Sequence, residues 1–261
     1  MLCLTNLLIA NNLYMRKITC ELCAYSVEAC RVARRLGVDR VELCASPAEG
    51  GVTPSLATIE RVAQIEGLAL SVMIRPRGGD FLYDDDEFET MLLDIARARE
   101  AGATGVVFGV LTADGRVDME RTRRLVEASE GMETTFHRAV DMAEDYEQAV
   151  RDIIEAGCTR ILTSGGRDKA MEGIEQIARA VAVAAGRIEI MAGSGVVAAN
   201  ALPLASTGVD ALHFSAKKMV EGAMRYRNPH ISMGGSAAVD EYALRKVDEE
   251  EVRDILKAIK H

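Results

Sequence analysis

The tripeptide Glu-Leu-Cys occurs twice, at residues 21–23 and 42–44, and brings carboxylates and thiols into one repeated pattern. Side chains alternate between the faces of a strand, so Glu and Cys share one face and Leu takes the other. Thiolates on neighbouring strands could hold a soft ion such as Cu(I) or Zn(II). Alternatively, both thiols are only buried, because free Cys is among the most buried residue types. The residues predicted to share this face are Glu21, Cys23, Glu42 and Cys44, with Cys23 and Cys44 as metal ligands.

A basic segment, Arg75-Pro76-Arg77-Gly78-Gly79, follows a later apolar run. The two arginines are two positions apart, and the glycines let the backbone come close to a ligand. Planar guanidinium groups hold carboxylate or phosphate through paired hydrogen bonds. We therefore predict an anion clamp at Arg75 and Arg77. Alternatively, they only pair with Glu21 and Glu42, and both statements can hold together.

A histidine and an arginine, His137-Arg138, follow the strand expected at residues 133–136, and His213 lies in the strand expected at residues 211–214. Histidine titrates near neutral pH, so it can transfer protons or bind metal. Alternatively, each histidine is a hydrogen-bonded structural group. With carboxylates or histidine as acid or base and arginines as a clamp, the candidate catalytic residues are Glu21, Glu42, Arg75, Arg77, His137 and Arg138.

Two glycine-rich turns, at residues 163–166 and 193–195, follow two further apolar runs. Backbone N–H groups at such turns bind phosphate in many barrels. Alternatively, glycine is needed there only for its backbone angles. The predicted anion-binding residues are Ser164, Gly165, Gly193, Ser194 and Gly195.

The elements that must position these residues are short strands alternating with helices. A helix-to-strand joint recurs with a glycine at residues 37, 102, 157 and 208, which is typical of a helix ended by glycine before a buried strand. Repeated βα units predict a parallel sheet. The predicted strands are residues 17–23, 40–44, 69–74, 105–108, 133–136, 160–163, 188–192 and 211–214. The predicted helices are residues 27–36, 54–65, 87–100, 118–130, 144–156, 172–185, 200–207 and 248–260.

Eight alternating strands and helices in a chain of 261 residues predict an α/β fold, a single-domain TIM (β/α)8 barrel, with an open doubly wound sheet as the alternative. Chemistry in such barrels lies at the carboxyl ends of the strands, where the residues named above fall. Residues 1–14 are predicted to be an N-terminal extension, and residues 15–261 the barrel domain.

Composition excludes several classes of protein. A net charge of −9 and 4% aromatic residues argue against nucleic-acid binding, and no apolar run is long enough to span a membrane. Six cysteines are too few for a disulfide scaffold, and the first basic residues follow the N-terminal apolar stretch, unlike those of a signal peptide. We therefore expect a cytoplasmic protein with reduced thiols.

Several of these segments, taken in order, resemble the CutC copper-homeostasis family. The resemblance runs from about residue 17 to the C-terminus. The segments that carry it are residues 42–44, 49–55, 74–81, 135–139, 162–165, 191–193, 224–228 and 239–242.

The resemblance implies a cytoplasmic TIM barrel that forms a homo-oligomer and functions in copper homeostasis. It also implies copper binding through the cysteines at positions 23 and 44, so Cu(I) is the expected ligand. Because copper leaves the arginines and glycine turns unexplained, a second hypothesis is an enzyme acting on a small anionic or phosphorylated metabolite. A third is that the barrel mouth only closes a salt-bridge network.

Overall fold

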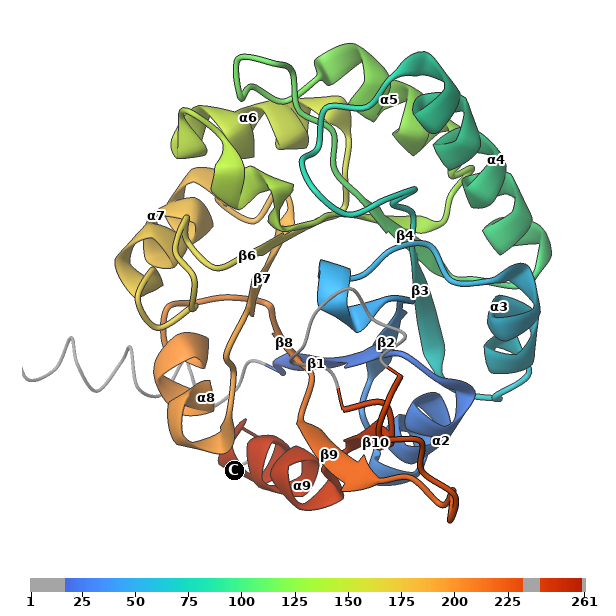
Figure 1. Ribbon diagram of the computed structural model, residues 1–261. Coiled ribbons are helices and arrows are strands. Elements are labelled where there is room, and N and C mark those ends of the chain that lie inside the picture. The colour runs from blue at the N-terminus through green and yellow to red at the C-terminus, as the bar shows by residue number, and fades with distance from the viewer. Residues whose placement is uncertain (1–16, 232–239, 260–261) are drawn as a thin grey trace, which may run out of the picture.

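Eight parallel strands close into a barrel in the computed structural model of the protein, which describes residues 17–231 and 240–259 (Figure 1). Each strand pairs with the next along the chain, and β8 pairs with β1. The strands are β1 (Thr19–Ala24), β2 (Arg40–Leu43), β3 (Ala69–Met73), β4 (Gly105–Phe108), β5 (Glu133–Phe136), β6 (Arg160–Thr163), β7 (Glu189–Gly193) and β8 (Ala211–Phe214). The predicted TIM barrel is therefore confirmed, and the open sheet is excluded.

A ring of helices surrounds the barrel, and α9 completes it between α8 and α2 (Figure 1). Two short 3-10 turns, η1 (Pro47–Glu49) and η2 (Arg138–Met142), lie in loops after β2 and β5. The helices are α2 (Val27–Leu36), α3 (Leu56–Ala63), α4 (Asp85–Glu100), α5 (Met119–Ala128), α6 (Tyr146–Ala156), α7 (Ile174–Ala184), α8 (Ala198–Ala205) and α9 (Glu249–Ile259).

The recurring glycines adopt the left-handed conformation that only glycine enters without strain. Gly37 and Gly157 cap α2 and α6 with φ of 77° and 90°, and each cap N–H donates to carbonyls of the last turn. Gly102 and Gly208 have φ of 96° and 92° after α4 and α8. The repeated helix-to-strand joint predicted from the sequence is thus present in all four places.

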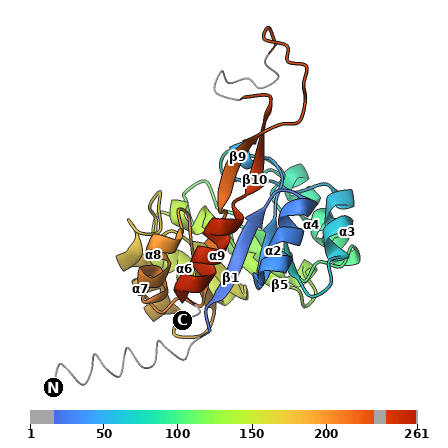
Figure 2. The same cartoon turned by 90° about the horizontal axis from the view of Figure 1, so that it is seen from below.

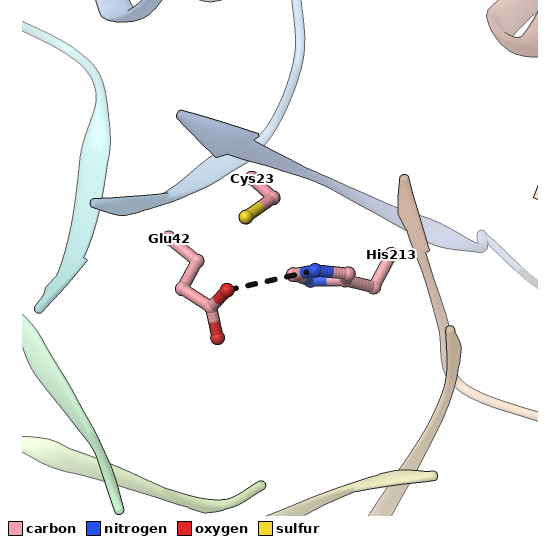
Figure 3. A group of neighbouring side chains, drawn as sticks. All are labelled: Cys23, Glu42 and His213. Carbon is pink, nitrogen blue, oxygen red and sulfur yellow. Dashed lines mark ion pairs between the residues drawn. The ribbon is translucent and has the colours of Figure 1, made fainter. Parts of the chain in front are cut away.

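The alternation along β1 and β2 sorts side chains between two cores. Leu22 and Leu43 are buried in the large apolar cluster between barrel and helices. The parallel register sets Cys23 of β1 beside Glu42 of β2, on the side of the strands that faces the barrel interior (Figure 3). Cys44 packs with Met73 and Val107, and Cys23 packs against this small cluster.

Near the amino ends of the strands, the barrel contains paired charged side chains. Arg40 pairs with the fully buried Glu21, and its Nη1 lies 3.7 Å from Glu133 Oε2. Arg160, also buried, donates to Glu133 Oε2 at 2.7 Å and to Glu189 Oε2 at 2.5 Å. Buried charges are tolerated only when they are paired, so these contacts hold the strands in their closed arrangement.

An antiparallel hairpin of β9 (Lys217–Glu221) and β10 (Ala243–Val247) follows the barrel and is not predicted from the sequence. It projects beyond the barrel at the end where the strands finish (Figure 2). Residues 232–239, between its two strands, lie outside the described ranges. So do residues 1–14, the expected N-terminal extension. Within the described residues, no helix is long and apolar enough to cross a membrane.

The ionic interior predicts unequal costs for two similar substitutions. Glu21→Gln should lower the free energy of unfolding by about 3–5 kcal/mol, because it leaves the buried Arg40 short of a partner. Glu189→Gln should cost at most about 1 kcal/mol, because the Glu189 side chain is 41% exposed. Urea unfolding of the two variants measures the difference, and equal costs would contradict this account of the interior.

Candidate functional site

A cavity of about 660 Å³ opens at the carboxyl ends of the barrel strands. Its walls come from β1, β2 and β8 on one side and from the loops after β3, β5, β6 and β7 on the other. Predicted site residues in its walls are Cys23, Glu42, Arg75, His137, Arg138, Ser194 and Gly195. Pockets of this size and position are the usual ligand sites of such barrels.

Cys23, Glu42 and His213 converge inside the barrel from β1, β2 and β8 (Figure 3). One ligand atom from each lies within 4.8 Å of the other two. His213 Nε2 is 3.5 Å from Glu42 Oε2. A thiol, a carboxyl group and an imidazole at this spacing are the donor types that bind transition metals.

Glu21 contacts the Nδ1 side of the His213 ring. Its Oε1 lies 2.8 Å from His213 Nδ1, and its Oε2 accepts a hydrogen bond from Arg40. Burial opposes ionisation of Glu21, but the His213 hydrogen bond and the Arg40 charge outweigh it and lower the pKa of this carboxyl to about 2. The contact leaves His213 Nε2 directed toward the cavity, as in metal sites where a carboxylate orients a histidine ligand.

The charge on His213 and the state of Cys23 are linked. Burial works against the imidazolium, but the Glu42 charge and hydrogen bonds with Cys23 and Glu21 raise the His213 pKa well above its usual value. The hydrogen bond from Cys44, followed by the hydrogen bond and charge of His213, lowers the pKa of Cys23 well below the usual thiol value. This shift favours the thiolate form of Cys23, which is the form that binds metals.

Cys44 lies beside this thiolate as a thiol. Its hydrogen bond to Cys23 and its burial raise its pKa. Its Sγ also donates to Glu42 Oε2 at 3.5 Å. Burial raises the Glu42 pKa well above the usual carboxyl value.

Arg75 is buried in the cavity wall just after β3, the strand that pairs with β2. Its Nη1 donates to the carbonyls of Glu49 and Gly51 at 2.6 and 2.9 Å, and its Nη2 donates to that of Gly79 at 2.9 Å. Its guanidinium lies over the ring of Phe81. The alternative that Arg75 pairs with Glu21 or Glu42 is not seen, because its partners are backbone carbonyls.

Arg77 does not join Arg75. Its Nε donates to Glu87 Oε1 at 2.5 Å, and its Nη1 lies 3.2 Å from Asp80 Oδ1. Glu87 belongs to the capping box at the start of α4, so this guanidinium fastens the loop to that helix. The predicted clamp of two arginines is thereby reduced to Arg75, because Arg77 turns away from the cavity.

His137 is buried in the same wall as Arg75. Its Nδ1 accepts the N–H of Ala139 at 3.2 Å, and its ring lies 4.9 Å from that of Phe81. Burial, together with the Arg75 and Arg138 charges, lowers the pKa of His137 to about 3. The imidazole is therefore neutral near pH 7, and its proton is on Nε2.

The turn after β6 already contains an anion from this chain. Asp141 accepts the N–H of Ser164 at 3.0 Å, the N–H of Gly166 at 2.9 Å and the hydroxyl of Thr163 at 2.6 Å. Arg138 Nε also donates to Asp141, at 3.0 Å. The phosphate site predicted here is corrected: the Asp141 carboxylate occupies this turn.

The Gly165 N–H, also predicted to bind an anion, donates to Thr163 Oγ1 at 2.9 Å within the same turn. Its φ is 71°, and a Cβ on Gly165 would lie 2.3 Å from the carbonyl oxygen of Gly173. Both features match the alternative that glycine is present for backbone geometry.

The turn after β7 does reach the cavity. Ser194 adopts a φ of 79°, and its hydroxyl donates to the Asp168 carbonyl at 2.5 Å. Gly193 lies inside the barrel, where a Cβ would come 2.5 Å from the Leu162 side chain. The first turn of α8 is partly satisfied, since the Ala198 N–H donates to Glu251 Oε1 at 2.9 Å.

Sequence reasoning missed several cavity residues. Phe81 and Lys169 lie in its wall, and Tyr25 lies next to the thiols. Phe81 comes directly after the basic segment and Lys169 shortly after the β6 turn, so their positions in loops at strand ends were the available signal. Arg40, which neutralises Glu21, begins its strand and offered no such signal.

The depressed pKa of His137 predicts a pH dependence of stability. The unfolded chain, with a histidine pKa of about 6.5, binds one more proton than the folded chain as pH falls toward 3. The free energy of unfolding should therefore fall with pH in this window, by up to about 1.4 kcal/mol per pH unit. His137→Gln should flatten this slope in urea unfolding between about pH 4 and pH 7. An unchanged slope would contradict the neutral, buried imidazole.

The comparisons with known proteins agree with this structure. The model of the CutC family matches residues 18–218. A family protein CutC of Bacteroides thetaiotaomicron is 46% identical over 248 residues, which cover 94% of this chain and 100% of the relative. A family protein CutC of an Enterobacter species is 45% identical, with 92% and 96% covered.

Solved structures give the same family and a wider fold likeness. A putative copper homeostasis protein CutC from Streptococcus agalactiae is 36% identical, with a TM-score of 0.72, covering 76% of this chain and 98% of that one. An aldolase, at 16% identity and a TM-score of 0.58, shares the fold alone. From the family model and these close relatives, we conclude that the chain belongs to the CutC family.

Proposed function

We propose that this protein functions in copper homeostasis by binding Cu(I) at Cys23 and Cys44. The observation that carries the proposal is the convergence of Cys23, Glu42 and His213 in the cavity wall, with ligand atoms within 4.8 Å of one another and the second thiol, Cys44, packed against Cys23. Thiolate sulfur is the ligand type that selects Cu(I). In this proposal copper is cargo, which enters and leaves through the open cavity.

His213 and Glu42 complete the donor set. His213 offers Nε2 because Glu21 holds its Nδ1. Binding a cation releases the protons of the Cys44 thiol and the imidazolium, since metal ligands must be deprotonated. Glu21 then keeps the imidazole oriented and balances the charge of Arg40, as a carboxylate behind a histidine ligand does.

Two further observations support the proposal. The related structure from Streptococcus agalactiae carries the words "putative copper homeostasis protein" in its description. Cys23, Cys30, Cys44 and Cys158 form no disulfide within the described residues. Reduced thiols fit Cu(I) chemistry and a reducing compartment, so we place the protein in the cytoplasm.

We further propose that the protein is a homo-oligomer. An isolated two-stranded hairpin is marginally stable in water, and clustered exposed apolar side chains mark interfaces. The projecting β9–β10 hairpin and the chain beyond it expose Met219, Met224, Tyr226, Ile231 and Leu244. Sedimentation equilibrium should give a mass above that of one chain, and Met219→Lys with Leu244→Lys should lower it. A monomeric wild-type protein would contradict this proposal.

Copper binding is tested by anaerobic titration with Cu(I) against a chromogenic chelator. The wild-type protein should bind one Cu(I) per chain, and the Cys23→Ser/Cys44→Ser variant should bind it more than about 100-fold more weakly, because both sulfur ligands are lost.

The matched control for this titration is Cys30→Ser/Cys158→Ser. It removes two buried thiols that lie outside the cavity wall, so it should keep wild-type affinity. Equal affinity and stoichiometry in wild type and the Cys23→Ser/Cys44→Ser variant would remove the proposal. Circular dichroism of each variant establishes that the fold is retained.

A further inference from the structure

Three buried polar atoms in the cavity wall have no hydrogen-bond partner among the described residues: Glu42 Oε1, Arg75 Nε and His137 Nε2. Their residues are only 2%, 6% and 5% exposed. Buried polar groups in folded proteins are almost always hydrogen-bonded, so each such atom calls for an explanation. Three in the wall of one cavity point to a ligand that would satisfy them.

Two of these atoms are hydrogen-bond donors. His137 Nδ1 already accepts the Ala139 N–H, so the proton of the neutral ring is on Nε2. Arg75 Nη1 and Nη2 donate to three backbone carbonyls, and Nε–H has no acceptor among the described residues. Within the described part of the chain, no carboxylate forms an ion pair with Arg75, so its charge has no counterion.

Both donors are fixed in place around one aromatic ring. The Arg75 guanidinium carbon lies 5.1 Å from the centre of the Phe81 ring, and the His137 ring centre lies 4.9 Å from it. The Arg75 contacts to Glu49 and Gly51 prevent the guanidinium from swinging away. A rigid cation and a rigid neutral donor make a preformed site for an anion with two oxygens.

We propose that the cavity binds a small hydroxy carboxylic acid, whose carboxylate is held by Arg75 Nε and His137 Nε2. Glu42 Oε1, the third atom without a partner, accepts the hydroxyl group of the same molecule. Lys169, in the wall as well, provides positive charge for a second acidic group.

A carboxylate fits the site better than a phosphate. Phosphate sites in barrels rely on several backbone N–H groups at turns and helix starts. Here Asp141 occupies the turn after β6, and Glu251 accepts the Ala198 N–H at the start of α8. One uncompensated guanidinium and one neutral imidazole instead match the single charge and two oxygens of a carboxylate.

The test is isothermal titration of the full-length protein, freed of metal by a chelator that is then removed, with glycolate, lactate, malate and citrate. Malonamide serves as a neutral probe and inorganic phosphate as the competing anion. At least one acid should bind with a millimolar or lower dissociation constant, while malonamide should not bind. Binding by phosphate alone, or no binding by any acid, would overturn the proposal.

Variants locate the acid within the cavity. Arg75→Lys keeps the charge and removes Nε, and His137→Phe keeps a ring and removes Nε2; each should weaken binding at least tenfold. His137→Gln retains an amide N–H near Nε2 and should restore part of the affinity. The matched control is Arg77→Lys, because this neighbouring guanidinium faces α4, and it should bind as wild type does.

Two results would overturn the location: wild-type affinity in both Arg75→Lys and His137→Phe, or equal losses in Arg77→Lys. If the Arg75 variant does not fold, the His137→Phe and His137→Gln pair decides alone. The outcome is separate from copper binding, because Cys23→Ser/Cys44→Ser should keep its affinity for the acid whether or not it binds Cu(I).

Discussion

Charge balance inside the closed barrel is the constraint on which the site depends. Closing the strands removes Glu21 from water completely, so its charge must be matched locally. Arg40 and His213 provide that match from the neighbouring strands β2 and β8. The protonated His213 in turn favours the thiolate of Cys23. The sulfur that we propose as a metal ligand is thus linked to ion pairs that run across three strands.

The cavity has two chemically different walls. One contains Cys23, with Cys44 packed against it, and His213, whose Nδ1 contacts the Glu21 carboxylate; these donors suit a soft cation. The other contains Arg75 and His137 against Phe81, which suits an anion. The Arg75 guanidinium is held by the backbone carbonyls of Glu49, Gly51 and Gly79 rather than by the thiols. The proposed copper site and the proposed acid site therefore share only Glu42.

Much of the fold could be predicted because it depends on local rules. The period of two along Glu-Leu-Cys separates Leu22 from Cys23 in any strand, and a glycine such as Gly37 ends a helix wherever it follows one. The hairpin escaped prediction because β9 begins Lys217-Lys218 and is exposed, so it lacks the apolar pattern of a barrel strand.

The site was harder to predict because its contacts join distant residues. Arg75 and Arg77 look equivalent in the sequence, but only the fold brings Glu87 against one of them. The turn at Ser164 has the composition of a phosphate site, but Asp141, 23 residues earlier, accepts the Ser164 N–H that a phosphate would need. Side-chain competition of this kind is settled by tertiary geometry.

The central claim is that Cys23 and Cys44 bind one Cu(I) ion together. X-ray absorption spectroscopy at the copper edge of the Cu(I)-loaded protein tests it directly, because sulfur and nitrogen neighbours scatter differently. The account predicts two sulfur neighbours and a lighter neighbour from His213 or Glu42, with the sulfur signal lost in Cys23→Ser/Cys44→Ser. A spectrum without sulfur, or one that the double substitution leaves unchanged, would contradict it.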